Sequence, residues 1–238
     1  MPENEKRIIL KLTGELFEDG KTHISFEKYD EIAKKIIAVS KAAKVQMAIV
    51  VGGGNIFRGR EAESNVDHTE ADSMGMMATV INGVGLREAL VRNGATDTRL
   101  MTAFNLPQFA EPFIRMKARH HLTQNRLVVL AGGLGQPNFS TDSAVAQYAD
   151  ELMCEMIFKA STVDGVYNSD PHKNLDAVKH SELTFDEAMT KNLKVMDKTA
   201  FAMCSNSGIP IFIFHSKDLE KLPLAVSGDF SFGTLIHK

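Results

Sequence analysis

The sequence contains two cysteines and no tryptophan, and so few thiols exclude a framework of several disulfides or a zinc site with four cysteine ligands. A basic excess is also missing, because 27 Lys and Arg residues stand against 30 Asp and Glu residues. The resulting net charge of −3 is atypical of a nucleic-acid-binding regulator, and no nucleic-acid partner is expected. No run of about 20 apolar residues and no signal peptide are found, so we expect a cytoplasmic protein without a membrane partner.

Repeats, low-complexity stretches and linkers rich in Pro, Gly or Ser are absent, so one continuous domain over residues 1–238 is expected. Short apolar runs alternate with helix-like segments. The apolar runs are Arg7–Leu12, Gln46–Val51, Leu127–Ala131, Met156–Lys159 and Ile209–Phe214. The helix-like segments are Phe26–Ala43, Asp72–Arg92, Ser143–Met153, Ala188–Leu193 and one that begins at Asp197 and ends before Gly208. Continuous apolar runs are typical of strands covered on both faces, so the pattern predicts an α/β fold with a parallel sheet.

Three of the predicted strands run directly into glycine, at Leu12–Gly14, Val51–Asn55 and Ala131–Gly135. In an open parallel sheet, ligands bind beyond the carboxyl ends of the strands, where glycine lets backbone N–H groups approach an anion. Three such loops at one edge favour a site for phosphate groups, whereas any one of them alone could be an ordinary strand-to-helix turn. Neither the P-loop pattern nor the G-x-G-x-x-G pattern matches these segments, so a nucleotide would be bound by another geometry.

Charged residues beside these loops are the next candidates. The Lys11 ammonium lies in an otherwise apolar strand, where it could offset the charge of a transferring phosphoryl group or point to solvent. The Arg58 guanidinium suits a phosphate or a surface ion pair, and the Asp72 carboxylate suits ribose hydroxyls or a helix cap. Carboxylates that could hold Mg²⁺ between phosphates, or serve as turn and cap residues, are Asp142, Asp164, Asp170 and Asp197. The methionines Met74, Met76 and Met77 are interpreted as part of the core.

A set of longer motifs covers almost the whole chain. They are RIILKLTGE (7–15), GGGNIFRG (52–59), ADSMGMMATVING (71–83), STDSA (140–144), KASTVDGVY (159–167) with SDP (169–171), LKVMDKTA (193–200) and GTLI (233–236). In this combination and order the chain resembles the bacterial uridylate kinases, a branch of the amino acid kinase family. The segments MGMMATVIN and LKVMD separate this branch from the alternative, relatives that phosphorylate a carboxylate or carbamate. A non-catalytic nucleotide-binding or storage protein is a second alternative, and the presence of Lys11, Asp142 and Asp197 argues against it.

The resemblance implies a three-layer α/β/α sandwich with a mostly parallel central sheet. UMP would be bound mainly by residues 1–150 and ATP mainly by residues 151–238. The implied reaction is transfer of the γ-phosphoryl group of ATP to UMP, with Mg²⁺, which gives UDP and ADP in pyrimidine nucleotide biosynthesis. A homohexamer is implied as well, and activation by GTP and inhibition by UTP are frequent in such enzymes.

The resemblance also implies roles for the residues that match its motifs. The implied catalytic residues are Lys11, Arg58, Asp142, Lys159 and Asp197. The implied ATP-binding residues are Lys11, Leu12, Thr13, Gly14, Gly54, Arg58, Ser161, Tyr167 and Asp170. The implied UMP-binding residues are Gly53, Asp72, Leu134, Gly135, Gln136, Pro137, Asn138, Phe139, Ser140 and Thr141, and the metal ligands are left unassigned. Leu134, Gln136 and Asn138 depart from the usual G-T-G-N-P-F-F-T-T-D pattern, which leaves the strictness for UMP over CMP or dUMP open.

Overall fold

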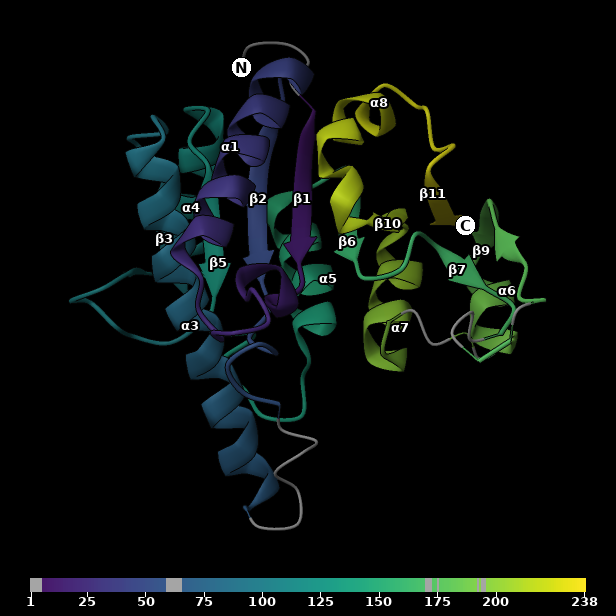
Figure 1. Cartoon of the computed structure of the whole chain (residues 1–238), viewed down its shortest axis with the longest axis horizontal. Coiled ribbons are helices and arrows are strands. Elements are labelled where there is room, and N and C mark those ends of the chain that lie inside the picture. Colours follow the sequence, from purple (N-terminus) through teal and green to yellow (C-terminus); the bar gives the residue numbers. More distant parts are fainter. Residues whose placement is uncertain (1–5, 59–65, 170–172, 175, 192, 194–195) are drawn as a thin grey trace.

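The computed structural model describes residues 6–58, 66–169, 173–174, 176–191, 193 and 196–238. Within these ranges, one nine-stranded sheet has the strand order β4-β3-β5-β2-β1-β6-β10-β11-β9 (Figure 1). Its strands are β1 (Arg7–Leu12), β2 (Gln46–Val51), β3 (Arg99–Thr102), β4 (Glu111–Pro112), β5 (Val128–Ala131), β6 (Met156–Ser161), β9 (Glu182–Thr184), β10 (Ile211–His215) and β11 (Gly233–His237). A separate two-stranded sheet pairs β7 (Val166–Tyr167) with β8 (Lys179–His180).

Neighbouring strands of the large sheet are parallel, except that β10 and β11 are antiparallel. β1 lies between β2 and β6, and Lys11 stands opposite Val50 on one side and Lys159 on the other. All six residues of β2 are buried, as a central strand covered on both faces requires. The mostly parallel sheet that the continuous apolar runs predict is therefore confirmed.

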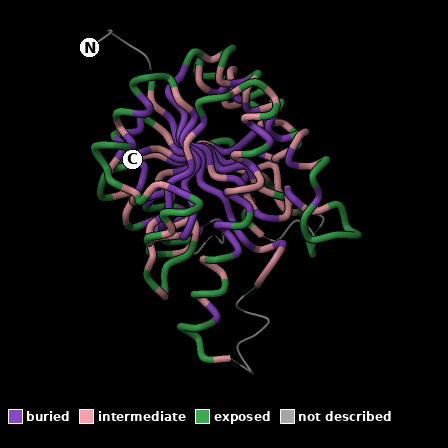
Figure 2. The backbone as a smooth tube through the Cα atoms, turned by 90° about the vertical axis from the view of Figure 1, so that its left-hand side faces the viewer, coloured by how far each residue is buried: buried purple, intermediate pink, exposed green. Residues whose placement is uncertain are grey.

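Helices cover both faces of the sheet and complete three layers. Leu10 of β1 belongs to a core cluster with residues of α1, α3 and α8, whereas Ile9 belongs to a second cluster with residues of α4, α5 and α7. Figure 2 shows the buried backbone gathered at the centre, between the outer elements. The helices are η1 (Gly14–Phe17), α1 (Phe26–Ala43), α3 (His68–Arg92), α4 (Arg115–Thr123), α5 (Thr141–Leu152), α6 (Phe185–Thr190), α7 (Lys198–Ser207), η2 (Ser216–Lys221) and α8 (Leu222–Val226), of which η1 and η2 are 3₁₀ helices. The expected α/β/α sandwich is confirmed, and within the described ranges no helix has the length and apolar character needed to cross a membrane.

Helix α3 differs from expectation at its start and on its surface. It begins at His68 and not at Asp72, because the Asp67 carboxylate caps it by accepting hydrogen bonds from the next backbone N–H groups. The cap alternative for Asp72 is therefore wrong, and its carboxylate makes other contacts. Met74 and Met77 are 48% and 45% exposed, so the interpretation of these two residues as core is also wrong.

Candidate active site

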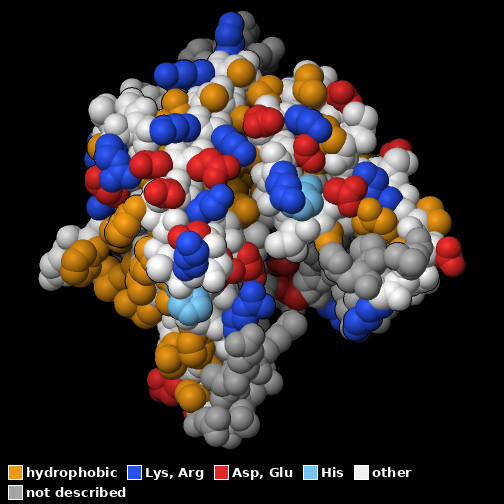
Figure 3. All heavy atoms as spheres, viewed as in Figure 1, with side chains coloured by type: hydrophobic (Ala, Val, Ile, Leu, Met, Phe, Trp, Pro, Cys, Tyr) orange, Lys and Arg blue, Asp and Glu red, His pale blue; other side chains and the backbone are white. Residues whose placement is uncertain are grey.

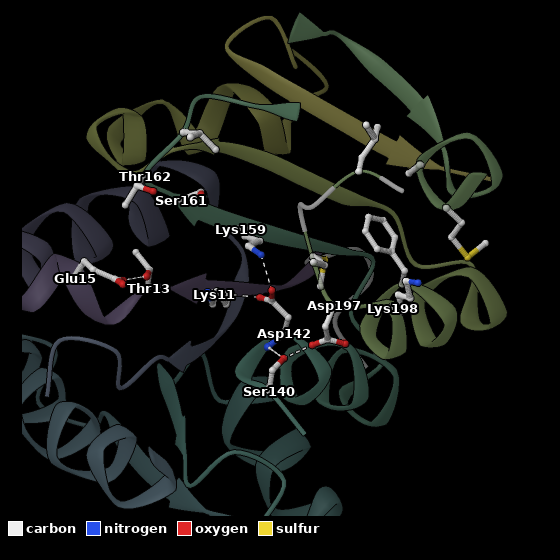
Figure 4. A pocket seen from close by; sticks show the side chains of 16 residues that line it. Lys11, Thr13, Glu15, Ser140, Asp142, Lys159, Ser161, Thr162, Asp197 and Lys198 are labelled. Atoms are coloured by element: carbon white, nitrogen blue, oxygen red, sulfur yellow. Dashed lines mark hydrogen bonds and ion pairs between the residues drawn. The ribbon is translucent and has the colours of Figure 1, made fainter. Parts of the chain in front are cut away.

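A cavity of about 900 Å³ opens at the carboxyl ends of β1 and β6, beside helices α5, α6 and α7 (Figure 4). Its polar lining consists of Lys11, Thr13, Glu15, Ser140, Asp142, Lys159, Ser161, Thr162, Asp197 and Lys198. Its apolar lining consists of Val163, Ala188, Met189, Leu193, Met196 and Phe201. The cavity thus lies at the edge of the parallel sheet where a ligand site is expected.

Lys11, Asp142 and Lys159 form a charged cluster at the base of this cavity (Figure 4). Lys11 and Lys159 are direct partners on neighbouring strands, so their side chains leave the same face of the sheet. Asp142 faces them from the first turn of α5: Lys159 Nζ lies 2.6 Å from Asp142 Oδ2, and Lys11 Nζ lies 3.5 Å from Asp142 Oδ1. The Lys11 side chain is 12% exposed, so the alternative in which it points to solvent is wrong.

The cluster holds more positive than negative charge, and its three side chains are largely buried. Burial opposes ionisation of Asp142, but the ammonium groups of Lys11 and Lys159 outweigh it and keep the pKa of this carboxyl below its ordinary value. Burial lowers the pKa of Lys159, although the attraction of Asp142 acts in the opposite direction. An anionic ligand placed against the two lysines would relieve the repulsion between them, so the cluster is suited to a phosphate chain.

Asp197 connects the two helices that flank the cavity. Its carboxylate accepts hydrogen bonds from the hydroxyl groups of Ser140 and Ser143, with Ser143 Oγ 3.1 Å from Oδ1. It also accepts the bond from the backbone N–H of Ala200, at 2.7 Å, that caps α7. Ser140 in turn caps α5. The cap alternative for Asp197 is confirmed, and the same carboxylate still lines the cavity.

Glu15 is a cavity residue that the sequence interpretation missed. Its carboxylate accepts hydrogen bonds from the Thr13 hydroxyl and from the Arg58 guanidinium, whose NH2 lies 2.9 Å from Oε1. Arg58 also donates from Nε to the carbonyl oxygen of Gly54, at 3.1 Å. Burial opposes ionisation of Glu15, but hydrogen bonds from the Thr13 hydroxyl and the backbone, together with the charges of Arg58 and Lys11, outweigh it and lower the pKa of Glu15. The ion pair considered for Arg58 is therefore present, at the rim of the candidate site.

The first two glycine loops are in direct backbone contact. A Cβ atom on Gly14 would lie 2.6 Å from the backbone nitrogen of Gly54 and 2.5 Å from Asn55 Oδ1, so no side chain fits there. The backbone N–H of Gly52 donates to the carbonyl oxygen of Leu12, at 2.9 Å. The side chain of Leu12 is buried in the core, so this residue reaches the site only through its backbone. The loops after β1 and β2 thus form one continuous surface of backbone groups.

The residues expected to bind UMP gather at a second part of this edge, near the start of α3. Asp72 Oδ2 accepts a hydrogen bond of 2.6 Å from the backbone N–H of Asn138, and His68 Nε2 lies 2.9 Å from Asn138 Oδ1. Leu134 is partly buried and packs against the second core cluster. The other expected residues follow β2 or β5: Gly53, Gly135, Gln136, Pro137, Phe139 and Thr141. This second region adjoins the cavity of Figure 4 through Ser140, which lines it.

The carboxylates that line the cavity determine whether it can hold a metal ion. Among the residues that the structure describes, no group of three or more His, Cys, Asp and Glu is arranged to hold one. Asp142 Oδ1 is buried without a hydrogen-bond partner, and the Asp197 carboxylate lines the same cavity. One or two carboxylates, completed by phosphate oxygens and water, are typical Mg²⁺ ligands. The residues therefore fit Mg²⁺ that is held together with a nucleotide, and do not form a metal centre of their own.

A model of the amino acid kinase family matches residues 6–215 of this sequence. The chain belongs to the amino acid kinase family. Among its relatives, the uridylate kinase of Corynebacterium efficiens is 40% identical over 233 residues, which cover 98% of this chain and 95% of the relative. The uridylate kinase of Corynebacterium jeikeium is 41% identical over 235 residues, which cover 98% of this chain and 94% of the relative.

Solved structures lead to the same assignment of the fold. A UMP kinase from Bacillus anthracis superposes with a TM-score of 0.93 at 34% identity and covers 98% of this chain and 96% of its own. A UMP kinase from Ureaplasma parvum superposes with a TM-score of 0.91 at 33% identity and covers 99% and 100%. The amino acid kinase fold expected from the motifs is therefore confirmed.

The ATP-binding residues implied by the amino acid kinase resemblance are only partly brought together. Ser161 lines the cavity at the end of β6, but Tyr167 does not, and its hydroxyl donates to Asp164 Oδ1 at 2.7 Å instead. Asp170 lies outside the described residues. Cavity residues that the sequence interpretation missed, besides Glu15, are Thr162, Val163, Ala188, Met189, Leu193, Met196, Lys198 and Phe201. Phe201 could have been found from its position one turn after the capping Asp197, which places both on one side of α7.

Proposed function

We propose that this amino acid kinase transfers the γ-phosphoryl group of ATP to UMP and forms UDP and ADP. The observation that carries the proposal is the charged cluster, in which lysines on neighbouring strands face one carboxylate at the base of a cavity. Positive charge that is in place before the ligand arrives lowers the barrier to phosphoryl transfer. The uridylate and UMP kinases among the relatives support a nucleoside monophosphate as the acceptor.

In the proposed mechanism, the triphosphate of ATP lies against Lys159 and Ser161, and Lys11 contacts the γ-phosphoryl group. An oxygen of the UMP phosphate attacks the γ-phosphorus in line, and the bond to the ADP oxygen breaks. The attacking phosphate is mostly a dianion at neutral pH, because its second pKa is about 6, so no general base is needed. Asp142 holds both ammonium groups in place through its ion pairs, and no covalent intermediate is required.

On the acceptor side, we assign the ribose of UMP to Asp72 and its phosphate to Gly53. We place Gly54 and Arg58, which the resemblance implies for ATP, between the phosphates of the two nucleotides, where Arg58 also contacts the UMP phosphate. The loop over residues 134–141 would contact the base. Asp72 and this loop already meet through the Asn138 backbone, so the two parts of the acceptor site are held together. UMP would thus be bound mainly by residues 1–150 and ATP mainly by residues 151–238 of a single domain.

Mg²⁺ is the proposed metal, held with the phosphates near Asp142 and Asp197, where it would neutralise part of the phosphate charge. The buried Asp142 Oδ1 supports this assignment, because it lacks a hydrogen-bond partner and its contact with Lys11 Nζ is a longer ion pair of 3.5 Å. Asp197 is already committed to capping α7 and to the serine hydroxyls, so Asp142 offers the less occupied oxygen.

A homo-oligomer, with a homohexamer implied by the resemblance, is part of the proposal. Met74, Met77 and Ile81 follow one another at helical spacing along α3 and are between 45% and 48% exposed. Figure 3 shows hydrophobic side chains gathered over the lower part of this helix. An exposed apolar face of this kind is typical of contact between chains. Activation by GTP, inhibition by UTP and a cytoplasmic location stay predictions from the sequence.

The proposal is tested by incubating the purified protein with ATP and Mg²⁺ and following the release of ADP. UMP, CMP, dUMP, aspartate and carbamate are supplied separately, and we expect fast release with UMP and slower release with CMP. Fast release with aspartate or carbamate would replace the proposed function by that of another branch of the family. No ADP release with any acceptor, together with measurable ATP binding, would indicate a non-catalytic nucleotide-binding protein.

A further inference from the structure

Helix α3 turns a row of small or polar residues toward the glycine loops at the edge of the sheet. Thr79 and Asn82 are 4% and 0% exposed, and their spacing of three residues places them on one face of the helix. A buried hydroxyl or amide must form hydrogen bonds to offset its loss of contact with water. Here each of the two side chains bonds to the backbone of a different glycine loop.

Asn82 binds the loop that follows β2. Its Nδ2 donates to the carbonyl oxygen of Gly52 at 2.7 Å and to Asn55 Oδ1 at 2.8 Å. Its Oδ1 accepts a hydrogen bond of 2.6 Å from the hydroxyl of Tyr29, on α1. Asn55 in turn donates to the carbonyl oxygen of His23 at 2.6 Å. We call Tyr29, Asn55 and Asn82 the amide network, and it contains only neutral groups.

The tyrosine of the amide network fixes the direction of its hydrogen bonds. Tyr29 is 1% exposed, and burial raises the pKa of its hydroxyl, which therefore keeps its proton and donates to Asn82. Because Asn82 Oδ1 accepts that bond, its Nδ2 is the end that faces the Gly52 carbonyl. A Cβ atom on Gly85 of α3 would lie 2.8 Å from the Tyr29 ring, so only glycine leaves room for the ring there.

Thr79 binds the loop that follows β5. Its Oγ1 accepts a hydrogen bond of 2.7 Å from the backbone N–H of Gly132 and donates one of 2.7 Å to the carbonyl oxygen of Met76, in its own helix. Gly132 has a φ of +84°, a conformation that favours glycine. Gly53, in the loop after β2, lies directly against α3. A Cβ atom on Gly53 would lie 2.8 Å from Ala78 Cβ and 2.9 Å from the Thr79 nitrogen. Loop and helix backbones are therefore in contact.

We propose that Thr79 and Asn82 are positioning residues for phosphoryl transfer, since together they fix the distance between the glycine loops after β2 and β5. The inference rests on the proposed function, in which both loops belong to the acceptor site. A helix is stiff, so two loops tied to positions one turn apart keep a constant spacing before UMP binds. Loss of either bond would leave a loop free to shift, and it would weaken the binding of UMP more than the binding of ATP.

The test compares Thr79→Val, Thr79→Ser and the control Thr98→Val. Thr98 is also a buried threonine, and its Oγ1 donates at 2.7 Å to a carbonyl three residues earlier, as that of Thr79 does. Its hydroxyl differs from that of Thr79 in that it forms no hydrogen bond with the glycine loops after β2 and β5. We expect Thr79→Val to raise the KM for UMP about tenfold and to leave the KM for ATP within about twofold. Thr79→Ser should restore the KM for UMP, and Thr98→Val should behave as the wild type.

Two further measurements keep the inference separable from folding and from the proposed function. Tyr29→Phe removes the hydrogen bond to Asn82 and changes no residue of the glycine loops. It should raise the KM for UMP about threefold and leave the KM for ATP unchanged. If the wild type does not phosphorylate UMP, the proposed function fails, and hydrogen exchange at the Gly132 amide still tests the positioning. Exchange should accelerate in Thr79→Val and not in Thr98→Val. Equal effects of the two valine variants on the KM for UMP and on this exchange would overturn the inference.

Discussion

The charged cluster and the amide network hold neighbouring parts of one sheet edge by different forces. In the charged cluster, ion pairs join Lys11 and Lys159 to Asp142 at a cavity that receives the ligand. In the amide network, neutral groups join helices to the backbone of a glycine loop. Ion pairs respond to pH and salt, whereas hydrogen bonds between neutral groups respond to neither. Charge and geometry are thus supplied by separate residues, and each can be altered alone.

The largest effect is expected from removing charge while the geometry is kept. Lys11→Ala should lower turnover by roughly 100- to 1,000-fold, because a preorganised charge at the transferring group is lost. The fold should persist, since Lys159 still pairs with Asp142 at 2.6 Å. Steady-state kinetics and thermal unfolding measure the two quantities. Lys6, just before β1, provides the control: its Nζ donates to the carbonyl oxygen of Val226, and Lys6→Ala should keep wild-type turnover. Normal turnover in Lys11→Ala would remove this lysine from the mechanism.

A second prediction uses pH to separate the two regions. At pH 7, Asp142→Asn should lower the free energy of unfolding by about 3 kcal/mol, because the buried Lys159 loses its counter-charge. The folded pKa of Asp142 lies below its ordinary value of about 3.9, so the stabilisation is complete above that pH and is lost as the pH falls through the folded pKa. The difference in urea stability between wild type and Asp142→Asn should therefore shrink between pH 7 and pH 3.

The neutral side of the same comparison is supplied by Thr79→Val, because Thr79 lies on the same face of α3 as Asn82 of the amide network and is also neutral. The loss of stability in this variant comes from an unpaired Gly132 N–H, which does not titrate. The difference in the free energy of unfolding between Thr79→Val and the wild type should therefore be equal at pH 7 and pH 3. A constant difference for Asp142→Asn, or one that shrinks equally for Thr79→Val, would contradict the division into charged and neutral regions.

The central strands could be predicted from the sequence because burial on both faces leaves a continuous apolar run. β1 (Arg7–Leu12) and β2 (Gln46–Val51) have the bounds that the apolar runs predict. β3 has the sequence RLMT, in which only Leu100 and Met101 are apolar, so it lacks the continuous apolar run that indicates β5. β11 (Gly233–His237) contains Thr234, a buried residue whose hydroxyl is satisfied by the carbonyl of His180, 54 positions away. The polar threonine argues against a buried strand when the sequence is considered alone, because the residue that satisfies its hydroxyl is distant in the chain.

The candidate site divides in the same way. Lys11 and Asp197 could be identified because their positions, at a strand end and before a helix, are local features of the sequence. Glu15 could not, because its importance comes from Arg58, 43 residues later. The same holds for the partners of Asn82 and Thr79, which lie 30 and 53 residues away. Hydrogen bonds of long sequence separation depend on the complete fold, and no local pattern indicates them.

Substitutions of Asp197 test whether a charged side chain stabilises the fold through its hydrogen bonds and not through its charge. Its carboxylate caps α7, and Asn is as good a cap as Asp because either offers an oxygen to the helix N–H groups. Asp197→Ala should lower the free energy of unfolding by about 1–2 kcal/mol, whereas Asp197→Asn should stay within about 0.5 kcal/mol of the wild type. Chemical denaturation at pH 7 measures both. An equal loss in the two variants would show that Asp197 stabilises the fold by its charge or by its second acceptor oxygen, and not by capping α7 alone.

The smallest effect on stability is expected at Arg58, where charge is exposed. Its side chain is 51% exposed and pairs with Glu15, and a surface ion pair contributes at most about 1 kcal/mol. Arg92 is a matched control, because it is 48% exposed and pairs with Asp30 at 2.7 Å on the outer part of α3. Both alanine variants should have nearly wild-type stability, but only Arg58→Ala should raise the KM for UMP, by about tenfold, since only Arg58 folds over the Gly54 loop. If the two variants have the same KM for UMP, the arginine at the rim is a surface ion pair and the acceptor phosphate is held by backbone groups alone.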